Sequence, residues 1–219
     1  MDLPGWQSLY DELKDQGFEI ISAAQDTQGD EAALPWFDKA NATFTQIVDK
    51  NHTISQLYNM VNVPTGVWID ENGMMVRPPE VAYTSDVNAK FGERRLYAAG
   101  QAYVDGIRDW VAKGADSEYA LTPEEVMARL EPHTDDQATA EAAFQLGVYF
   151  ASQGDEERAN TFWQQAQELR PNDWNYHRQD WAFTPTEAGR NWMEKFNGMA
   201  DDEEYYPTLD IPGATEFAP

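Results

Sequence analysis

The residues that most often carry protein chemistry are few and scattered in this sequence of 219 residues. It contains no cysteine, so these residues offer no thiol nucleophile, no thiolate metal ligand and no disulfide. The three histidines, His52, His133 and His177, are isolated, with no second histidine or carboxylate at the spacing of helical metal ligands. We therefore expect no metal site, no cofactor and no catalytic residue within this chain.

Common enzyme motifs are absent as well. The sequence has no phosphate-binding glycine loop, no Gly-x-Ser-x-Gly and no His-Glu-x-x-His. The segment Asp70-Glu71-Asn72-Gly73 begins like a calcium-binding loop, but the rest of that pattern is missing, and Asn-Gly between two apolar runs predicts a hairpin turn.

The charge balance restricts the partners. The 15 Lys+Arg residues stand against 39 Asp+Glu, a net charge of −24. Such a chain has no basic field for nucleic acid or for anionic lipid. No apolar run approaches the roughly 20 residues of a membrane span, and the chain as written begins without a leader, so we expect a cytoplasmic protein without membrane insertion.

The first half, residues 1–114, reads as an α/β domain. Apolar periodicity and turn residues predict helices and strands in alternation. Residues 80–100 show no helical or strand periodicity, which predicts an irregular insertion. The expected helices are 3–16, 31–39, 53–60 and 101–113, and the expected strands are 18–24, 44–48, 63–70 and 74–76.

One motif on these elements resembles a known family. Val61-Asn62-Val63-Pro64-Thr65, then an apolar run ending in Asp70, then Asn72-Gly73, matches the thioredoxin-like redoxins of the TlpA/ResA type, within the redoxin and AhpC/TSA group. The resemblance covers about residues 4–113. It implies a thioredoxin-like sheet with flanking helices, a cis peptide bond before Pro64, and binding of extended substrate segments at Val63, Pro64 and Thr65. By itself, Pro64 would simply open a strand.

The family's Cys-x-x-Cys ends a central first strand, which this chain lacks, because its first helix corresponds to the remainder of the family's cysteine-bearing helix. Two interpretations follow: the reading frame begins too late, or the redox centre has been lost. The first is favoured, because a sheet without its central strand leaves backbone groups unpaired. In that case a missing leader would allow an extracytoplasmic or periplasmic location.

The second half carries one unit that resembles the 34-residue tetratricopeptide (TPR) repeat. Small residues at two positions would let two antiparallel helices approach, and large aromatic residues would fill the space between them. We expect helices near 123–130 and 185–196 to complete an all-α TPR-like domain over 115–199. An acidic, extended tail over 200–219 follows, which is expected to be loose, with binding of Tyr205-Tyr206-Pro207 to a groove as the alternative. The residues on the repeat positions are Leu146, Gly147, Phe150, Ala159, Trp163, Ala166 and Pro171.

Two functions follow. The resemblance implies a thiol–disulfide oxidoreductase or thiol antioxidant, whose chemistry needs a thiolate, so this chain as written is expected to be redox-inert. The alternative is a non-catalytic module that binds proteins or extended peptides through the thioredoxin-like surface and the TPR groove. The sequence predicts no oligomeric state.

Overall fold

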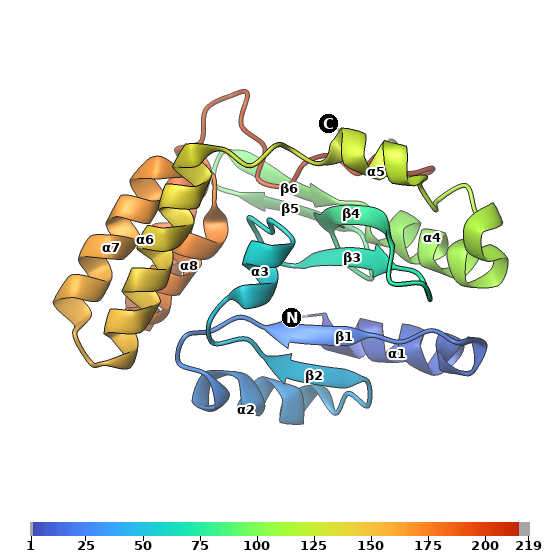
Figure 1. Cartoon of the computed structure of the whole chain (residues 1–219), viewed down its shortest axis with the longest axis horizontal. Helices are drawn as coiled ribbons and strands as arrows, with labels where there is room; N and C mark the ends of the chain where they lie inside the picture. The colour runs from blue at the N-terminus through green and yellow to red at the C-terminus, as the bar shows by residue number, and fades with distance from the viewer. Residues whose placement is uncertain (1, 215–219) are drawn as a thin grey trace.

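The computed structural model describes residues 2–214. Helices and strands alternate in the first half, and helices dominate the second (Figure 1). In chain order they are α1 (Leu3–Leu13), η1 (Lys14–Gln16), β1 (Ile21–Ala24), α2 (Asp30–Ala40), β2 (Thr45–Val48), α3 (Thr53–Leu57), β3 (Thr65–Ile69), β4 (Met75–Val81), β5 (Val87–Phe91), β6 (Arg94–Ala98), α4 (Gly100–Lys113), η2 (Gly114–Asp116), α5 (Pro123–Arg129), α6 (Asp135–Ser152), α7 (Glu156–Leu169), α8 (Trp174–Ala182) and α9 (Pro185–Asn197).

The strands form three two-stranded sheets among the described residues. β1 pairs with β2 in parallel, whereas β3–β4 and β5–β6 are antiparallel hairpins. The short, mostly apolar run of residues 18–24 predicts a strand buried on both faces. This prediction is wrong, because Ile21 is 67% exposed and the rest of β1 is half-buried. β1 also pairs with one strand only, so its other edge is unpaired.

The expected irregular insertion over 80–100 is instead largely ordered as a hairpin. β4 runs on to Val81, and β5 and β6 pair residue for residue from Val87 with Ala98 to Phe91 with Arg94. Two adjacent prolines predict the end of a strand, because neither can donate a ladder hydrogen bond. Pro78-Pro79 instead lie inside β4. Between the pairs Trp68–Arg77 and Gly66–Glu80, β4 contains both prolines whereas β3 contains one residue, so β4 has a bulge here. The bulge leaves the two prolines outside the regular pairing, where their lack of an N–H group does not break a ladder hydrogen bond.

The core of the first half lies between β3, β4 and the helices α1 and α4. Trp68 of β3 is 4% exposed and donates its indole N–H to the hydroxyl of Tyr103 on α4, at 2.8 Å. Its ring stacks on Trp110 at 5.2 Å between centroids. This packing fixes β3, and therefore the loop that precedes it, against the helices.

In the second half, α6, α7 and α8 group at one end of the sheets (Figure 1). α6 and α7 form a closely packed pair, and α8 and α9 continue the group. The expectation that residues 123–130 complete this stack was wrong, because α5 packs on β4 instead, burying Val126. α8, which the sequence analysis did not predict, takes the neighbouring position.

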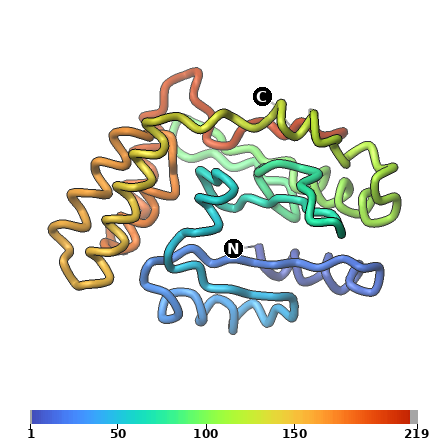
Figure 2. Tube along the Cα trace, viewed as in Figure 1, coloured from blue at the N-terminus to red at the C-terminus, as the bar shows by residue number. Residues whose placement is uncertain are grey.

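The C-terminal segment does not form the expected loose tail. Residues 200–214 contain no helix or strand, but they run back across the first half next to β6 (Figure 2). Tyr205, Leu209, Ile211 and Ala214 are each at most 8% exposed and join the hydrophobic clusters of both halves. Apolar side chains at these positions stabilise the segment by burial. Residues 215–219 of the expected tail lie outside the described part.

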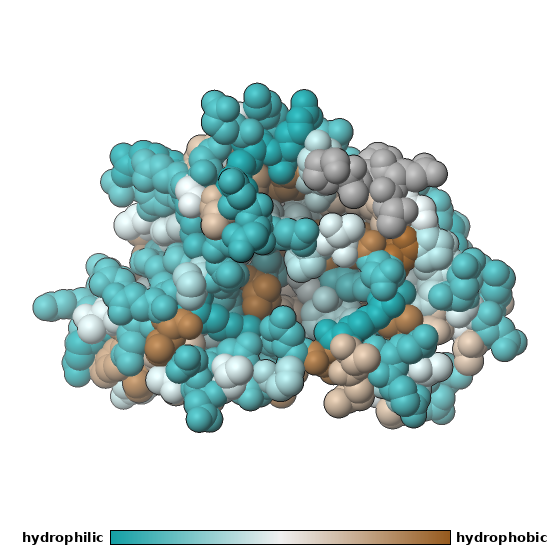
Figure 3. Space-filling view, turned by 90° about the horizontal axis from the view of Figure 1, so that it is seen from above, coloured by the Kyte–Doolittle hydropathy of each residue, from teal (hydrophilic) through white to brown (hydrophobic). Residues whose placement is uncertain are grey.

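The surface agrees with the composition. In Figure 3 it is mainly hydrophilic, and hydrophobic residues appear as small separate areas. No helix within residues 2–214 is long and apolar enough to cross a membrane.

Candidate functional site

The loop before β3 is held by backbone contacts from both halves of the molecule. The Val63–Pro64 bond is cis, as the family resemblance implied. Val61 accepts a hydrogen bond from the N–H of Asn175 at the start of α8, at 3.2 Å. Pro64 accepts one from the N–H of Ala82, just after β4, also at 3.2 Å. The loop is therefore clamped between the helical region and the β3–β4 hairpin.

Both backbone groups of Val63 already have partners within the chain. Its N–H donates to Oδ1 of Asn62 at 2.9 Å, and its carbonyl accepts from the hydroxyl of Tyr206 at 2.7 Å. The Thr65 hydroxyl donates to the carbonyl of Asn62 at 2.7 Å, which tightens the turn. The three predicted binding residues thus lie together, half-buried, beneath the C-terminal segment.

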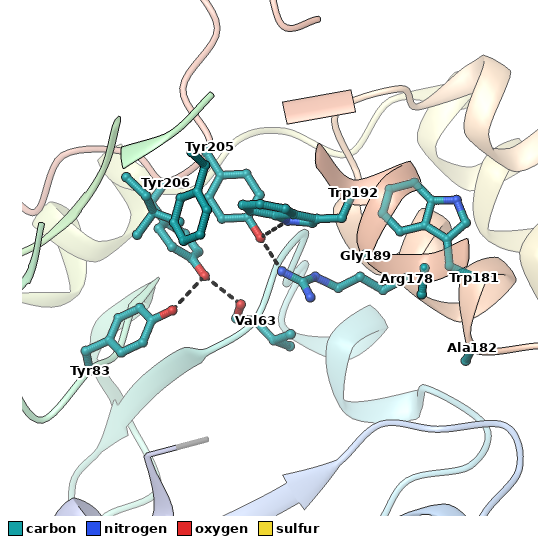
Figure 4. Close-up of a pocket in the computed structure, with 12 residues that line it drawn as sticks. Val63, Tyr83, Arg178, Trp181, Ala182, Gly189, Trp192, Tyr205 and Tyr206 are labelled. Carbon is teal, nitrogen blue, oxygen red and sulfur yellow. Dashed lines mark hydrogen bonds between the residues drawn. The ribbon is translucent and has the colours of Figure 1, made fainter. Parts of the chain in front are cut away.

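The C-terminal segment lies over this loop, with a bend at Tyr205 and Tyr206. Asn62, which is 4% exposed, donates its side-chain N–H to the backbone carbonyl of Tyr205 at 3.0 Å. The hydroxyls of Tyr206 and Tyr83 lie 3.3 Å apart, and Figure 4 shows both directed at the Val63 carbonyl side of the pocket. The loop therefore binds both the main chain and a side chain of this segment.

The second hydroxyl of the tyrosine pair is held from the helical half. Tyr205 accepts hydrogen bonds from the guanidinium of Arg178 on α8 and from the indole N–H of Trp192 on α9, the latter at 3.0 Å. Its ring packs edge-on against Trp174 and Phe196. Residues from α8 and α9 thus converge on the Tyr205 hydroxyl (Figure 4), whereas the loop contacts the backbone carbonyl of the same residue.

The electrostatics of the site suit neutral hydrogen bonding. Burial raises the pKa of Tyr206 far above its usual value and raises that of Tyr83 as well. Both hydroxyls therefore stay protonated at physiological pH. Tyr206 donates to the Val63 carbonyl, and the Tyr83 hydroxyl pairs with the Tyr206 hydroxyl. Within residues 2–214 no group of three His, Cys, Asp or Glu side chains is placed to hold a metal ion.

The residues on the TPR positions lie on the facing sides of α6 and α7, with two exceptions. Gly147, Ala159, Trp163 and Ala166 are buried, the last three at 1% exposed or less, and Phe150 packs at the edge of the same cluster. Leu146 is 43% exposed, and Pro171 lies on the surface just after α7. This helix pair is a structural support and is separate from the loop.

Several site residues carry little signal in the sequence. Asn62 stands inside the recognised motif, and the Tyr205-Tyr206 pair is visible as two adjacent aromatic residues, but neither type indicates a contact with Val63. Arg178 and Trp192 meet Tyr205 only because α8 and α9 fold back across the chain; Arg178 is 116 residues from Asn62, to which its Nε donates at 3.3 Å.

The comparisons with known proteins relate part of the chain to redoxins. The chain is 34% identical over 86 residues to the thiol-disulfide oxidoreductase ResA of Oceanobacillus iheyensis, which covers 39% of this chain and 44% of that protein. It is 27% identical over 92 residues to ResA of Halalkalibacterium halodurans, covering 42% of this chain and 52% of the relative.

The chain thus spans about half the length of these curated relatives. No protein-family model matches it, and no solved structure matches it. Over about two fifths of its length, therefore, the chain is similar to thiol-disulfide oxidoreductases of the ResA type, which supports a thioredoxin-like redoxin.

Proposed function

We propose that this chain is a redoxin-like protein that binds extended polypeptide segments at the loop of Val63, Pro64 and Thr65, and that its 219 residues do not themselves carry out thiol–disulfide exchange. The relatives are named thiol-disulfide oxidoreductases. That exchange begins with a thiolate attacking a disulfide sulfur, and the sequence contains no cysteine to supply it.

One observation supports the binding role most directly. The loop and α8 already hold a segment of polypeptide, the chain's own Tyr205 and Tyr206. Asn62 donates to the backbone carbonyl of Tyr205, Arg178 donates to the Tyr205 hydroxyl, and Val63 accepts from the Tyr206 hydroxyl. A surface that binds main-chain and side-chain groups in this way is suited to a partner segment of similar sequence. We propose that the Tyr205-Tyr206 segment occupies the site until such a partner segment replaces it.

The proposal predicts which part of a ligand matters. The Tyr205 hydroxyl accepts from a charged guanidinium, and hydrogen bonds to charged groups are worth about 1.5–3 kcal/mol. A ligand that lacks this hydroxyl should therefore bind roughly 10- to 100-fold more weakly. Because the change is made in the ligand, it cannot unfold the protein.

The test uses a fluorescein-labelled peptide of residues 202–212 and fluorescence polarisation. In the unaltered chain the tethered segment competes at an effective concentration on the order of millimolar, so binding should be weak. Tyr206→Phe removes the bond to the Val63 carbonyl and should tighten peptide binding several-fold. Tyr149→Phe, at an exposed position on α6, is the matched control and should behave like the unaltered chain.

The peptide in which the residue corresponding to Tyr205 is phenylalanine should bind at least tenfold more weakly to the Tyr206→Phe protein. Equal binding of this peptide, or of a scrambled one, would contradict the proposal. The redox part is tested separately: the 219-residue chain should not reduce insulin disulfides in the presence of dithiothreitol above the uncatalysed rate, and clear turnover would overturn it.

A further inference from the structure

A cavity of about 540 Å³ lies beside the loop, between β5, β6, α8, α9 and the Tyr205-Tyr206 segment (Figure 4). Its size falls within the range of roughly 300–1,000 Å³ that is typical of small-molecule sites. It exists with the C-terminal segment in place, because Tyr205 and Tyr206 form part of its wall. A ligand in it would therefore bind alongside the segment.

The cavity has one charged group, the guanidinium of Arg178. Its hydrogen-bond partners are both neutral, the hydroxyl of Tyr205 and the side-chain oxygen of Asn62. Within residues 2–214 no carboxylate lies within 4.0 Å of it, although the chain carries 39 acidic residues and ion pairs form at Arg77 and Arg108. A guanidinium has five N–H donors, so Arg178 retains donors and an unneutralised charge.

The rest of the lining is largely aromatic and apolar. The indoles of Trp181 and Trp192 come from α8 and α9, and Phe91 comes from β5. The ring of Phe91 lies edge-on to Trp192 with centroids 5.0 Å apart. Aromatic walls of this kind favour a planar apolar ring, which packs on them face-on or edge-on.

Gly189 of α9 is a lining residue without a side chain. A Cβ atom built on Gly189 of α9 meets no other atom within 4 Å, so the backbone here borders free space. Because Gly189 also lines the cavity, a larger side chain at this position is a means of narrowing it.

We propose that this cavity binds a small carboxylate that carries an aromatic ring. The carboxylate would take the free donors of Arg178, a geometry in which two parallel N–H···O bonds form, and the ring would lie against the indoles. This site is independent of the proposed function, because it needs the Tyr205-Tyr206 segment closed, whereas peptide binding needs that segment displaced.

The experiment is calorimetric titration of the full chain with 3-phenylpropionate, with neutral 3-phenylpropanamide and ring-free butyrate as matched probes. We expect saturable binding of 3-phenylpropionate, and binding at least tenfold weaker for each of the other two. Absence of binding, or equal affinity for the acid and the amide, would overturn the proposal.

Two variants locate the site. Gly189→Leu should abolish binding by filling the cavity, while Gly189→Ala, which makes the same change to the helix backbone with less bulk, should leave affinity within about twofold. Arg178→Gln should weaken binding of the acid at least tenfold and leave binding of the amide unchanged. Binding that survives Gly189→Leu would place the ligand elsewhere and refute the assignment.

The two proposals fail separately. If 3-phenylpropionate does not bind, the fluorescence polarisation test with the 202–212 peptide still decides the proposed function. If instead the peptide does not bind and the acid does, the cavity stands as a site of its own.

Discussion

The same substitution, glycine to alanine, should have opposite effects at two helical positions. Gly147 lies in α6 and Gly189 in α9. A Cβ atom on Gly147 would overlap three atoms of the Trp163 indole, whereas a Cβ atom on Gly189 meets nothing. Sequence propensity alone predicts stabilisation at both positions, so the pair isolates the contribution of packing.

The magnitudes follow from two terms. Replacing glycine by alanine inside a helix gains about 0.5–1 kcal/mol, because the unfolded chain loses freedom and helix propensity rises. At Gly189 this is the whole effect. At Gly147 the added methyl meets a ring that is 1% exposed and packs on Phe183, so it cannot turn away. Overpacking costs about 1–3 kcal/mol, and the upper half of that range leaves a net loss of about 1–2 kcal/mol.

The assay is urea unfolding followed by circular dichroism. Gly189→Ala should raise the free energy of unfolding and Gly147→Ala should lower it, a separation of about 2 kcal/mol, with similar slopes against urea. Adding Trp163→Phe to Gly147→Ala should make the glycine substitution less costly than it is beside the indole, because the smaller ring leaves room for the methyl. If Gly147→Ala stabilises the protein as much as Gly189→Ala does, the close approach of α6 and α7 at this point is refuted.

Three further predictions concern buried polar groups. Burial lowers the pKa of His52. Below about pH 6.5 the histidine is therefore protonated in the unfolded chain but stays neutral in the folded chain. The free energy of unfolding should consequently fall by up to ~1.4 kcal/mol for each unit that the pH is lowered. Urea titrations between pH 5 and 7.5 should show a shallower loss for His52→Gln, and an equal slope would contradict this. Burial raises the pKa of Asp173 to about 7, so its ionisation costs stability as the pH rises from about 4 to 7. The stability of Asp173→Asn relative to the unaltered chain should therefore increase over that range, and a flat difference would exclude it. Arg77, which is 2% exposed, makes two 2.7 Å bonds to Glu80. Arg77→Met should cost about 3–5 kcal/mol in urea unfolding at pH 7, because it leaves the Glu80 carboxylate with only the more distant Arg129, at 3.7 Å. Adding Glu80→Gln should recover part of the loss, and a single-variant cost below about 1 kcal/mol would argue against the pair.

Local patterns predicted those elements whose formation depends on their own residues. Helix 3–16 appears as α1 followed by η1, and Gly17 takes the left-handed conformation at its end, with φ of 82°. The Asn72-Gly73 turn joins β3 to β4. Thr122 caps α5 in a capping box with Glu125. In each case the periodicity or the turn residue acts within a few positions, so no distant contact is needed to decide it.

Elements whose state depends on distant partners were predicted poorly. Residues 87–91 and 94–98 are strands because they pair with each other as β5 and β6. Pro78-Pro79 lie within β4 because they form a bulge opposite Val67. α5 was placed correctly in the sequence but assigned to the wrong neighbour. Helix amphipathicity shows that a face is buried and does not say what covers it.

For the candidate site, too, some features follow from the sequence and others only from the tertiary structure. The sequence by itself determined that these 219 residues hold no thiol and that the net charge is −24, and it showed the resemblance of Val63-Pro64-Thr65 to a redoxin motif. Only the tertiary structure decided that Tyr206 donates to the Val63 carbonyl and that Arg178 and Trp192 hold the Tyr205 hydroxyl. These contacts join residues as many as 143 positions apart, and which side chains meet at that separation is set by the packing of α8 and α9 on the loop, which no local pattern in the sequence records.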